Sequence, residues 1–494
     1  NYEITFFLII FIIFILLNSI FKIATVYSLS TLKKNIITTL QFDILKNFFS
    51  TSFNFYYKVK FYQITSAIQK DLSFLASGVV AYLQQICNFF YLTFLIIVPF
   101  IISWKVSLIM LLVMSISILP YVFFNIIYKK IGTKTYRKNN IFTKLFVSYL
   151  LSVKFVKTKK LESLVLKNLD KIFKKLLNLD IKLKVTNSII YELVTLISFI
   201  SLIITFLVSK KLNIEFYIVI ATFFAFFRIL PILFNSFVML GTLKTSEGCF
   251  QNIAKLNKLA LNNLNIDNNK KSFAFKKISK IKLTNIDYDY PNKKRALNKI
   301  NYTFSSGNIY GIFGTSGSGK STLLETILGL NLPKKGKLLV NDIDFNKINL
   351  NLFCKKTGFV DSNNQLLSLT IKNNFSILNN ELTNREINKL LNFSNSLSFV
   401  NKLPRKLNTS IGDTTNLLSS GQKQRICISR ALVDSPDLII FDEGTNHLDK
   451  KNEILILEKL KLMKKNKIII FSTHNKNLKH YFDKILYIEN GKIL

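Results

Sequence analysis

Hydrophobic residues form long stretches in the first half of the chain and short ones in the second half. Residues 4–21, 72–104 and 106–128 contain no Asp, Glu, Lys or Arg, and no uncharged apolar stretch after residue 245 is as long. A helix needs about 20 apolar residues, rising about 1.5 Å each, to cross the hydrocarbon core of a membrane. The pattern therefore predicts membrane-spanning helices at residues 4–26, 78–102, 105–128, 188–209 and 215–240.

Two other interpretations of these stretches are less favoured. Buried helices of a large soluble domain are one alternative, but uncharged runs of this length exceed the helices of ordinary cores. Residues 4–21 also resemble the core of a signal peptide, yet no basic segment precedes them and the run is long for that role. We therefore expect these residues to form part of a membrane span.

The second half of the chain has a different pattern, in which short apolar runs alternate with amphipathic segments. The runs at 309–313, 357–360, 438–441 and 468–472 are typical of buried strands. Strands that alternate with helices predict a mainly parallel α/β sheet, which binds its ligand at the carboxyl ends of the strands. We expect a membrane domain over 1–250, a linker rich in Asn and Lys over 251–280, and an α/β domain over 281–494.

The chain is strongly basic, with a formal net charge of +39. Only seven of its 67 basic residues are Arg, and the lysines are spread along the whole sequence. A nucleic-acid-binding protein usually gathers Arg and Lys on one face. The charge therefore favours a solvated, lysine-rich surface, and we expect no nucleic-acid partner.

The distribution of charge predicts which side of the membrane each segment faces, and the cysteines indicate the redox compartment. The basic segments 27–74 and 129–187 contrast with the short turns near 103–105 and 210–213, so the two segments should lie on the same side of the membrane as the second half. Cys87, Cys249, Cys354 and Cys427 have no paired spacing, which argues against a disulfide framework or a zinc site. We expect the second half to work in a reducing compartment.

A phosphate-binding loop follows the apolar run 309–313. The pattern G-x-x-x-x-G-K-[ST] is met by Gly314, Thr315, Ser316, Gly317, Ser318, Gly319, Lys320 and Ser321. A strand before the loop and a helix over 322–328 are the context that this motif requires, and its glycines let backbone N–H groups surround phosphate oxygens. Lys320 should reach the β- and γ-phosphates, and the Ser321 hydroxyl should bind Mg²⁺.

Three further segments should place polar or reactive residues at the same edge of the sheet. Asp442 and Glu443 end an apolar strand, where one acid can bind Mg²⁺ through water and the other can polarise an attacking water. Ser419 and Gly421 begin a predicted helix, whose N–H groups and dipole favour an anion. His474 follows the strand at 468–472.

The order of these motifs resembles that of the ATP-binding cassette, and residues 1–250 resemble the membrane half of its exporter branch. Exporters of this kind usually have six spans in each half. Five are visible here, so we expect that the first span lies before Asn1. With one cassette in the chain and ATP held between two cassettes, the resemblance implies a dimer of half-transporters in a lipid membrane, a homodimer in preference to a heterodimer.

The resemblance also implies a role for each matching position, with ATP and Mg²⁺ as cofactors. Adenine would stack on Tyr290, the phosphates would bind Gly314 through Thr322, and Mg²⁺ would bind Ser321 and Asp442. Glu443 would be the general base and His474 would clamp the γ-phosphate. Residues that would serve a nucleotide on a second cassette or the dimer interface are Ser419, Gly421, Gln422 and Asp449. The segment 409–413 looks like the coupling segment of the exporter branch.

Two positions depart from the family pattern. The glutamine expected in the Mg²⁺-sensing loop is replaced by Ser362, which can reach Mg²⁺ through water, or by Gln365 if the loop is longer. Ser420 stands where the helix-start motif usually has glycine. The first departure puts the coupling between hydrolysis and membrane movement in doubt.

These observations predict an ATPase coupled to export across a membrane, with the cassette on the cytosolic or matrix side. Candidate cargo-binding residues are Glu192, Arg228 and Asn235, because polar groups inside spans are costly. Residues 152–156 and 231–235 resemble mitochondrial exporters that serve iron–sulfur assembly, which points to a glutathione- or sulfur-containing cargo and a mitochondrial-type inner membrane. Two alternatives stay open. One is a non-hydrolysing regulatory partner in a heterodimer. The other is a soluble cassette that acts on ribosomes, because residues 444–449 of this chain resemble a segment of those translation factors.

Overall fold

The computed structural model describes residues 2–116, 118–211, 214–264, 273–290, 295–411 and 417–494. The chain divides into two compact units. The first comprises Asn1–Thr51 and Phe55–Leu264, and the second comprises Ser52–Asn54 and Asn265–Leu494. The predicted boundary at residue 250 therefore lies inside the first unit, and part of the predicted linker (265–272) lies outside the described residues.

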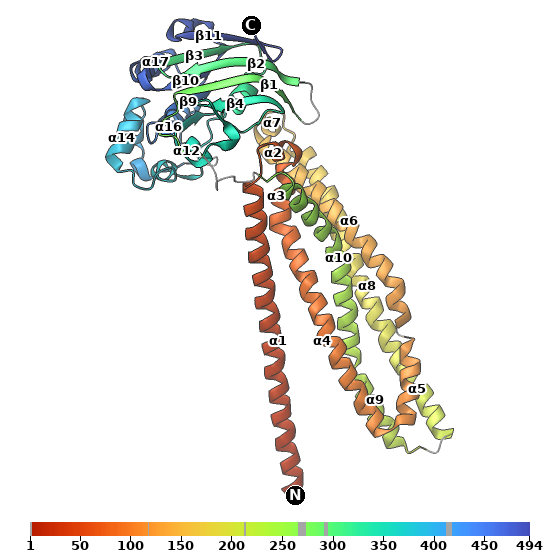
Figure 1. The fold of residues 1–494 in the computed structure, drawn as a ribbon. Helices are drawn as coiled ribbons and strands as arrows, with labels where there is room; N and C mark the ends of the chain where they lie inside the picture. Colours follow the sequence, from red (N-terminus) through yellow and green to blue (C-terminus); the bar gives the residue numbers. More distant parts are fainter. Residues whose placement is uncertain (1, 117, 212–213, 265–272, 291–294, 412–416) are drawn as a thin grey trace. The chain divides into compact units, whose positions relative to one another are not determined.

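The first unit is helical throughout its described part (Figure 1). Its helices are α1 Tyr2–Phe49, α2 Asn54–Lys58, α3 Phe61–Ser66, the π-helical turn η1 Ala67–Asp71, α4 Leu72–Ile102, α5 Trp104–Ser115, α6 Ile118–Leu151, α7 Val153–Thr158, α8 Glu162–Lys211, α9 Phe216–Phe227 and α10 Leu230–Leu261. Four long helices, α4, α6, α8 and α10, lie alongside one another. The basic segments 27–74 and 129–187 are largely helical in their described residues.

Three helical stretches of the described residues are long and apolar enough to cross a membrane: Phe61–Ile102, Glu162–Lys211 and Phe216–Leu261. The first two contain the predicted spans 78–102 and 188–209, and the third, formed by α9 and α10, begins at Phe216 and covers the rest of the span predicted at 215–240. A span at 4–26 stays a prediction, although α1 is helical there. The span predicted at 105–128 also stays a prediction; its described residues belong to α5, which ends at Ser115, and to α6, which begins at Ile118.

Helix α10 continues past residue 250 because its inward face stays apolar. Cys249, Ile253, Leu256 and Ala260 are all buried at helical spacing, and the last three pack in a cluster with α1, α2 and α4. A linker at residue 251 would leave this stripe exposed. Tertiary packing, not local composition, therefore decides where the helix ends.

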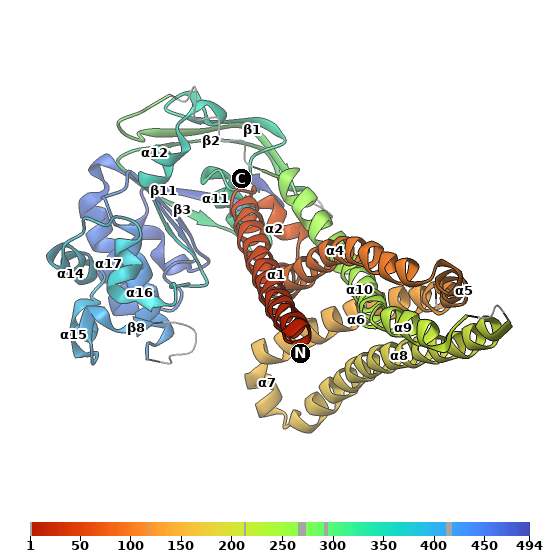
Figure 2. The same ribbon diagram turned by 90° about the horizontal axis from the view of Figure 1, so that it is seen from below.

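The second unit is an α/β fold with two main sheets (Figure 2). Its strands are β1 Lys280–Asp289, β2 Arg295–Ser305, β3 Asn308–Phe313, β4 Lys335–Val340, β5 Ile343–Asp344, β6 Thr357–Val360, β7 Leu369–Thr370, β8 Ser410–Ile411, β9 Leu438–Asp442, β10 Ile468–Ser472, β11 Lys484–Glu489 and β12 Lys492–Ile493. Its α-helices are α11 Lys320–Ile327, α12 Leu350–Lys355, α13 Ile371–Ser376, α14 Asn384–Phe393, α15 Leu397–Lys402, α16 Ser420–Ala431 and α17 Lys450–Met463.

The six-stranded sheet has the order β12-β11-β3-β10-β9-β6, and β11, β3, β10, β9 and β6 run parallel. All four strands expected from the apolar runs are confirmed. Every residue of β9 and β10 is buried, as expected for central strands covered on both faces. Because the strands are parallel, the carboxyl ends of β3, β9 and β10 meet at one edge.

A separate antiparallel sheet, β2-β1-β4-β5, packs on the same core. Helices α13 to α16 surround a smaller cluster that includes Phe375, Leu391, Val400 and Ile426. Helices α14 and α15 lie at the end of the unit away from β1 and β2 in both views. The phosphate-binding loop, between β3 and α11, lies beside the larger core, so a rigid sheet positions it.

Candidate nucleotide-binding site

The loop between β3 and α11 has a backbone shape that requires its glycines. Gly317 and Gly319 have φ angles of +80° and +111°, a region that other residues rarely adopt. A Cβ on Gly314 would lie 2.4 Å from the Ile488 carbonyl oxygen, and one on Gly319 would lie 2.8 Å from that of Ala296. Neighbouring backbone therefore packs closely against the loop at Gly314 and Gly319. At Gly317, in contrast, a Cβ would meet no atom within 4 Å. That open side is where a phosphate fits.

Lys320 folds back over the loop that it follows. Its Nζ donates to the carbonyl oxygens of Gly314 and Thr315, both at 2.9 Å, and the residue is only 7% exposed. A buried ammonium held by carbonyl groups can transfer these hydrogen bonds to phosphate oxygens without moving far. This geometry suits the predicted contact with the β- and γ-phosphates.

A cavity of about 700 Å³ opens beside the loop. It is lined by Tyr290, Arg295, Ala296, Ser316, Gly317, Gly319, Lys320, Ser321, Thr322, Glu443, Asn490 and Gly491. This volume is within the range of small-molecule sites. The structure thus brings the predicted adenine, phosphate and general-base residues to one place.

The two acids at the tip of β9 have different surroundings. Asp442 is 9% exposed, and one of its oxygens accepts hydrogen bonds from the Ser472 hydroxyl at 2.6 Å and the Ser321 hydroxyl at 3.2 Å. Burial raises the pKa of the Asp442 carboxyl, and these two hydrogen bonds oppose the rise. Asp442 and Ser321 therefore face each other, as a shared metal site requires.

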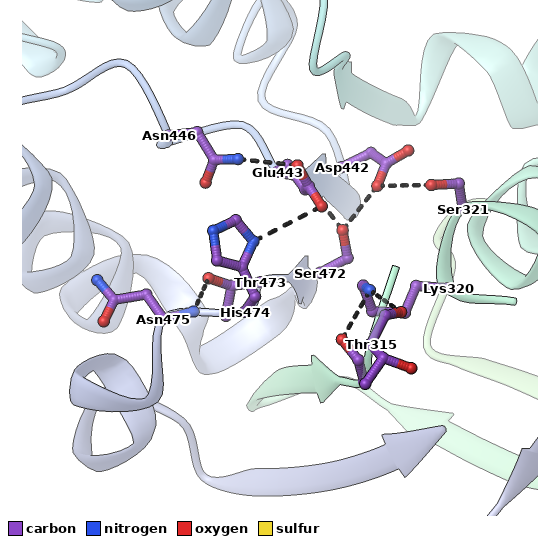
Figure 3. A network of polar contacts seen from close by, with 11 residues as sticks. Thr315, Lys320, Ser321, Asp442, Glu443, Asn446, Ser472, Thr473, His474 and Asn475 are labelled. Carbon is purple, nitrogen blue, oxygen red and sulfur yellow. Dashed lines mark hydrogen bonds and ion pairs between the residues drawn. The ribbon is translucent and has the colours of Figure 1, made fainter. Parts of the chain in front are cut away.

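Glu443 is held in a conformation unusual for its residue type, with φ +49°. One carboxylate oxygen accepts from the Asn446 amide at 2.8 Å, and the other lies 3.8 Å from Nδ1 of His474 (Figure 3). The adjoining segments that follow β9 and β10 carry these three side chains. The predicted general base and the predicted γ-phosphate clamp therefore lie together, next to the loop.

The surroundings of Asp442 fit Mg²⁺ by their chemistry. The hydroxyl of Ser321 and the carboxylate of Asp442 are oxygen donors, and Mg²⁺ usually keeps several waters and binds one or two carboxylates together with phosphates. Among the described residues, no group of three or more His, Cys, Asp or Glu is placed to hold a metal alone. The donor set thus matches a metal that arrives with a nucleotide.

Tyr290 reaches the cavity from the end of β1. Its hydroxyl donates to Glu325 at 2.9 Å and lies 3.0 Å from the Thr322 hydroxyl, and its ring meets Tyr288 edge-on at 5.1 Å. These contacts fix the ring, as a stacking platform needs. Pro291, which follows it, lies outside the described residues.

Several predicted residues do not line this cavity. Ser419 caps α16, where its Oγ accepts from the backbone N–H of Gln422 at 3.2 Å. Asp449 precedes α17, and its carboxylate accepts from the Asn452 amide at 2.5 Å. A Cβ on Gly421 would lie 2.7 Å from the His447 carbonyl oxygen. Of the segment 409–413, Gly412 and Asp413 lie outside the described residues.

Ser362 also stands apart from the cavity. Its hydroxyl donates to its neighbour Asp361 at 3.4 Å, and neither Ser362 nor Gln365 is among the lining residues. The backbone carbonyl of Gln365 accepts from Arg430 at 2.9 Å. The Mg²⁺-sensing role of Ser362 or Gln365 therefore stays a prediction.

Comparison with known proteins agrees with the sequence motifs. Residues 297–446 match the ABC transporter family, and residues 1–237 match the ABC transporter transmembrane region. The chain belongs to the ABC transporters. In this family, the α/β unit is the ATP-binding cassette.

Curated relatives of this ABC transporter align with only part of it. A putative export ATP-binding/permease protein of Rickettsia bellii is 34% identical over 199 residues, which cover 40% of this chain and 34% of that relative. The alpha-hemolysin translocation ATP-binding protein of Escherichia coli is 33% identical over 198 residues, 40% of this chain and 28% of that relative. The chain therefore spans about a third of the length of these relatives in the alignment.

Among solved structures, a bacterial Atm1-family ABC exporter with ATP bound superposes with a TM-score of 0.80. The match covers 94% of this ABC transporter and 82% of that chain at 18% sequence identity. At this identity the likeness establishes the fold, a helical membrane domain followed by a nucleotide-binding domain.

Some site residues escaped the sequence motifs. Asn490 and Gly491 line the cavity from the β11–β12 turn, where the Gly491 N–H donates to the Ser318 carbonyl at 2.9 Å. An Asn-Gly pair between two short strands is a hairpin signal, so the turn itself was readable from the sequence. Its packing against the loop, and the place of Ser472 beside Asp442, required the sheet register.

Proposed function

We propose that this ABC transporter is one half of an exporter that hydrolyses ATP as a dimer and moves a compound across a membrane. The observation that carries the proposal is a cavity lined by Lys320, Ser321 and Glu443, in which Ser321 contacts Asp442 and Glu443 lies beside His474, in a cassette joined to a helical membrane unit.

Each residue has a defined task in the proposed hydrolysis. Lys320 and the loop N–H groups bind the phosphates, and Mg²⁺, when bound, neutralises charge on the β- and γ-phosphates. Glu443 accepts a proton from a water whose oxygen bonds to the γ-phosphorus. The bond from that phosphorus to the bridging oxygen breaks, and ADP and phosphate leave. His474, which lies beside Glu443, holds the γ-phosphate.

The dimer completes the site in this proposal. Ser419 and Gly421 begin a helix that can offer N–H groups and its dipole to an anion, yet they do not line the cavity of their own chain. A second copy presents the same helix start to the γ-phosphate. Two identical cassettes then close around two nucleotides, which favours a homodimer.

The cargo is proposed to be a glutathione- or other sulfur-containing compound, exported from the cytosolic or matrix side of a mitochondrial-type membrane. Support comes from the fold likeness to an Atm1-family exporter and from segments 152–156 and 231–235. Arg228 and Glu192 are exposed in the membrane unit and Asn235 is half-buried, so all three can meet a polar cargo or a second copy.

Turnover in lipid vesicles tests the proposed function. The purified chain should hydrolyse ATP when Mg²⁺ is present. Glu443→Gln should lower turnover by about 100-fold or more with nucleotide binding kept, because it removes only the proton acceptor. Lys320→Ala should weaken ATP binding. Lys347→Ala, an exposed lysine that does not line the cavity, is the matched control and should change neither quantity.

Three outcomes would contradict the proposal. A chain that stays in the aqueous fraction after membrane extraction would remove the membrane role. A chain without affinity for ATP would remove the cassette role. ATP binding without turnover would replace the proposal by that of a non-hydrolysing partner in a heterodimer. Uptake of glutathione conjugates into inverted vesicles, compared with lipids and peptides, tests the cargo.

A further inference from the structure

Ser472, the last residue of β10, lies beside the two acids of β9. The parallel register pairs Ser472 with Asp442 on the neighbouring strand, so their side chains leave the sheet at the same level. Ser472 is only 1% exposed. No motif of the nucleotide site includes it.

One hydroxyl contacts both acids. The Ser472 Oγ donates to a carboxylate oxygen of Asp442 at 2.6 Å and accepts from the backbone N–H of Glu443 at 3.1 Å (Figure 3). A serine hydroxyl has one proton and two lone pairs, so both bonds can exist at once. The hydroxyl therefore connects the metal-side acid with the backbone of the water-side acid.

Both acids need such support for physical reasons. The Asp442 carboxylate is buried, and a buried charge is costly without hydrogen-bond donors. Glu443 has a positive φ, which costs on the order of 1 kcal/mol or more unless neighbouring groups hold the backbone. The Ser321 hydroxyl shares the same Asp442 oxygen at the longer distance of 3.2 Å. Once Ser321 turns to a metal ion, the hydrogen bond from Ser472 remains to support this oxygen.

We propose that Ser472 is a positioning residue that sets the Mg²⁺-binding orientation of Asp442 and the water-facing orientation of Glu443 together. The proposal rests on the proposed ATP hydrolysis and adds a residue to it. Groups that orient the ligands of a metal typically change metal affinity or activity by about 10–100-fold when removed. A purely structural serine would change the yield of folded protein, but not how turnover depends on Mg²⁺.

The test compares Ser472→Ala, Ser472→Thr and Ser429→Ala in the full chain in lipid vesicles. Ser472→Ala should lower kcat by about 10–100-fold and raise the Mg²⁺ concentration needed for half-maximal turnover. Ser472→Thr keeps the hydroxyl and should restore both. Ser429→Ala removes another fully buried hydroxyl of the same unit, on α16, and should leave both unchanged.

Nucleotide affinity gives a second readout that does not depend on turnover. In a Glu443→Gln background, Mg²⁺ should increase the affinity for a fluorescent ATP analogue. Ser472→Ala should reduce that increase by about 10-fold or more, and leave affinity in the presence of a chelator unchanged.

Each failure has a distinct meaning. If the parent chain does not hydrolyse ATP, the proposed function is wrong. If the parent is active and Ser472→Ala matches it in kcat and Mg²⁺ dependence, or if Ser429→Ala loses as much, the positioning role is wrong. Should the threonine variant not fold, Ser472→Cys keeps the size and weakens the donor. It should lose about as much as Ser472→Ala, and normal turnover in it would overturn the inference.

Discussion

At the scale of single residues, Tyr290, the residue predicted to stack on adenine, is held by a chain of side-chain hydrogen bonds. Tyr290 donates to Glu325 at 2.9 Å, and the amide of Asn331 donates to the same carboxylate oxygen at 2.6 Å. Asn331 is fully buried, so Glu325 is anchored from the interior side. A tyrosine ring held at its hydroxyl and against Tyr288 loses less freedom when a base stacks on it.

We predict that Tyr290→Phe and Glu325→Ala act through the same contact. Each should raise the ATP concentration for half-maximal turnover by about 3- to 10-fold with little change in kcat, because one hydrogen bond contributes about 0.5–1.5 kcal/mol. The double variant should be no weaker than the worse single variant. Titration of ATP against turnover measures this, and additive losses in the double variant would show that Glu325 does not act through Tyr290.

At the scale of elements, helix starts combine stability with function. Helices α14 and α16 both begin with a capping box: Thr383 with Glu386, and Ser419 with Gln422. In each, the hydroxyl accepts from a backbone N–H that has no partner inside the helix. The two caps are alike in structure, but only the second is proposed to meet a nucleotide.

We therefore predict different outcomes for two similar substitutions. Ser419→Ala and Thr383→Ala should each lower the stability of the cassette by about 1 kcal/mol, the usual effect of losing a cap. Only Ser419→Ala should also lower ATP turnover. Thermal melting and turnover of the same preparations measure both quantities, and equal turnover in the two variants would argue against a nucleotide contact at α16.

The element scale also shows where local patterns are sufficient. Strands β3, β9 and β10 follow from continuous apolar runs, since central parallel strands are buried on both faces. The short run of β6 predicted a strand too, although β6 lies at the edge of the sheet and leaves Phe359 exposed. Strand β1 was not predicted, because its residues alternate between buried and exposed and irregular pairing near Leu283 and Ile286 breaks the alternation. Its place was decided by pairing with β2 and β4, which are distant in sequence.

At the scale of the whole molecule, the membrane unit depends on close approach between helices. A Cβ on Gly132 of α6 would lie 2.7 Å from the Thr245 Cα of α10, whereas one on Gly248 would lie 3.5 Å from the Tyr136 ring. Small residues at such contacts let helix backbones approach closely. The two glycines therefore differ in the space that they leave.

We predict that Gly132→Ala destabilises the membrane unit by about 1–3 kcal/mol, because the backbone of α10 cannot yield to the added methyl group. Gly248→Ala, the matched control, should be neutral or slightly stabilising, since alanine favours a helix over glycine. Thermal unfolding of the detergent-solubilised chain measures both. An unchanged Gly132→Ala variant would show that α6 and α10 do not need this contact.

The sequence by itself determined the order of a membrane unit and a cassette, the phosphate loop from Gly314, and the acids at Asp442 and Glu443. These depend on local patterns: long apolar runs, glycines where a turn demands them, and polar groups at strand ends. The tertiary structure alone decided that α10 continues to Leu261, that Gly491 packs against the phosphate loop, and that Ser472 bonds to Asp442. Each of these depends on which distant segments become neighbours, and a strand or helix does not encode its neighbour's register in its own residues.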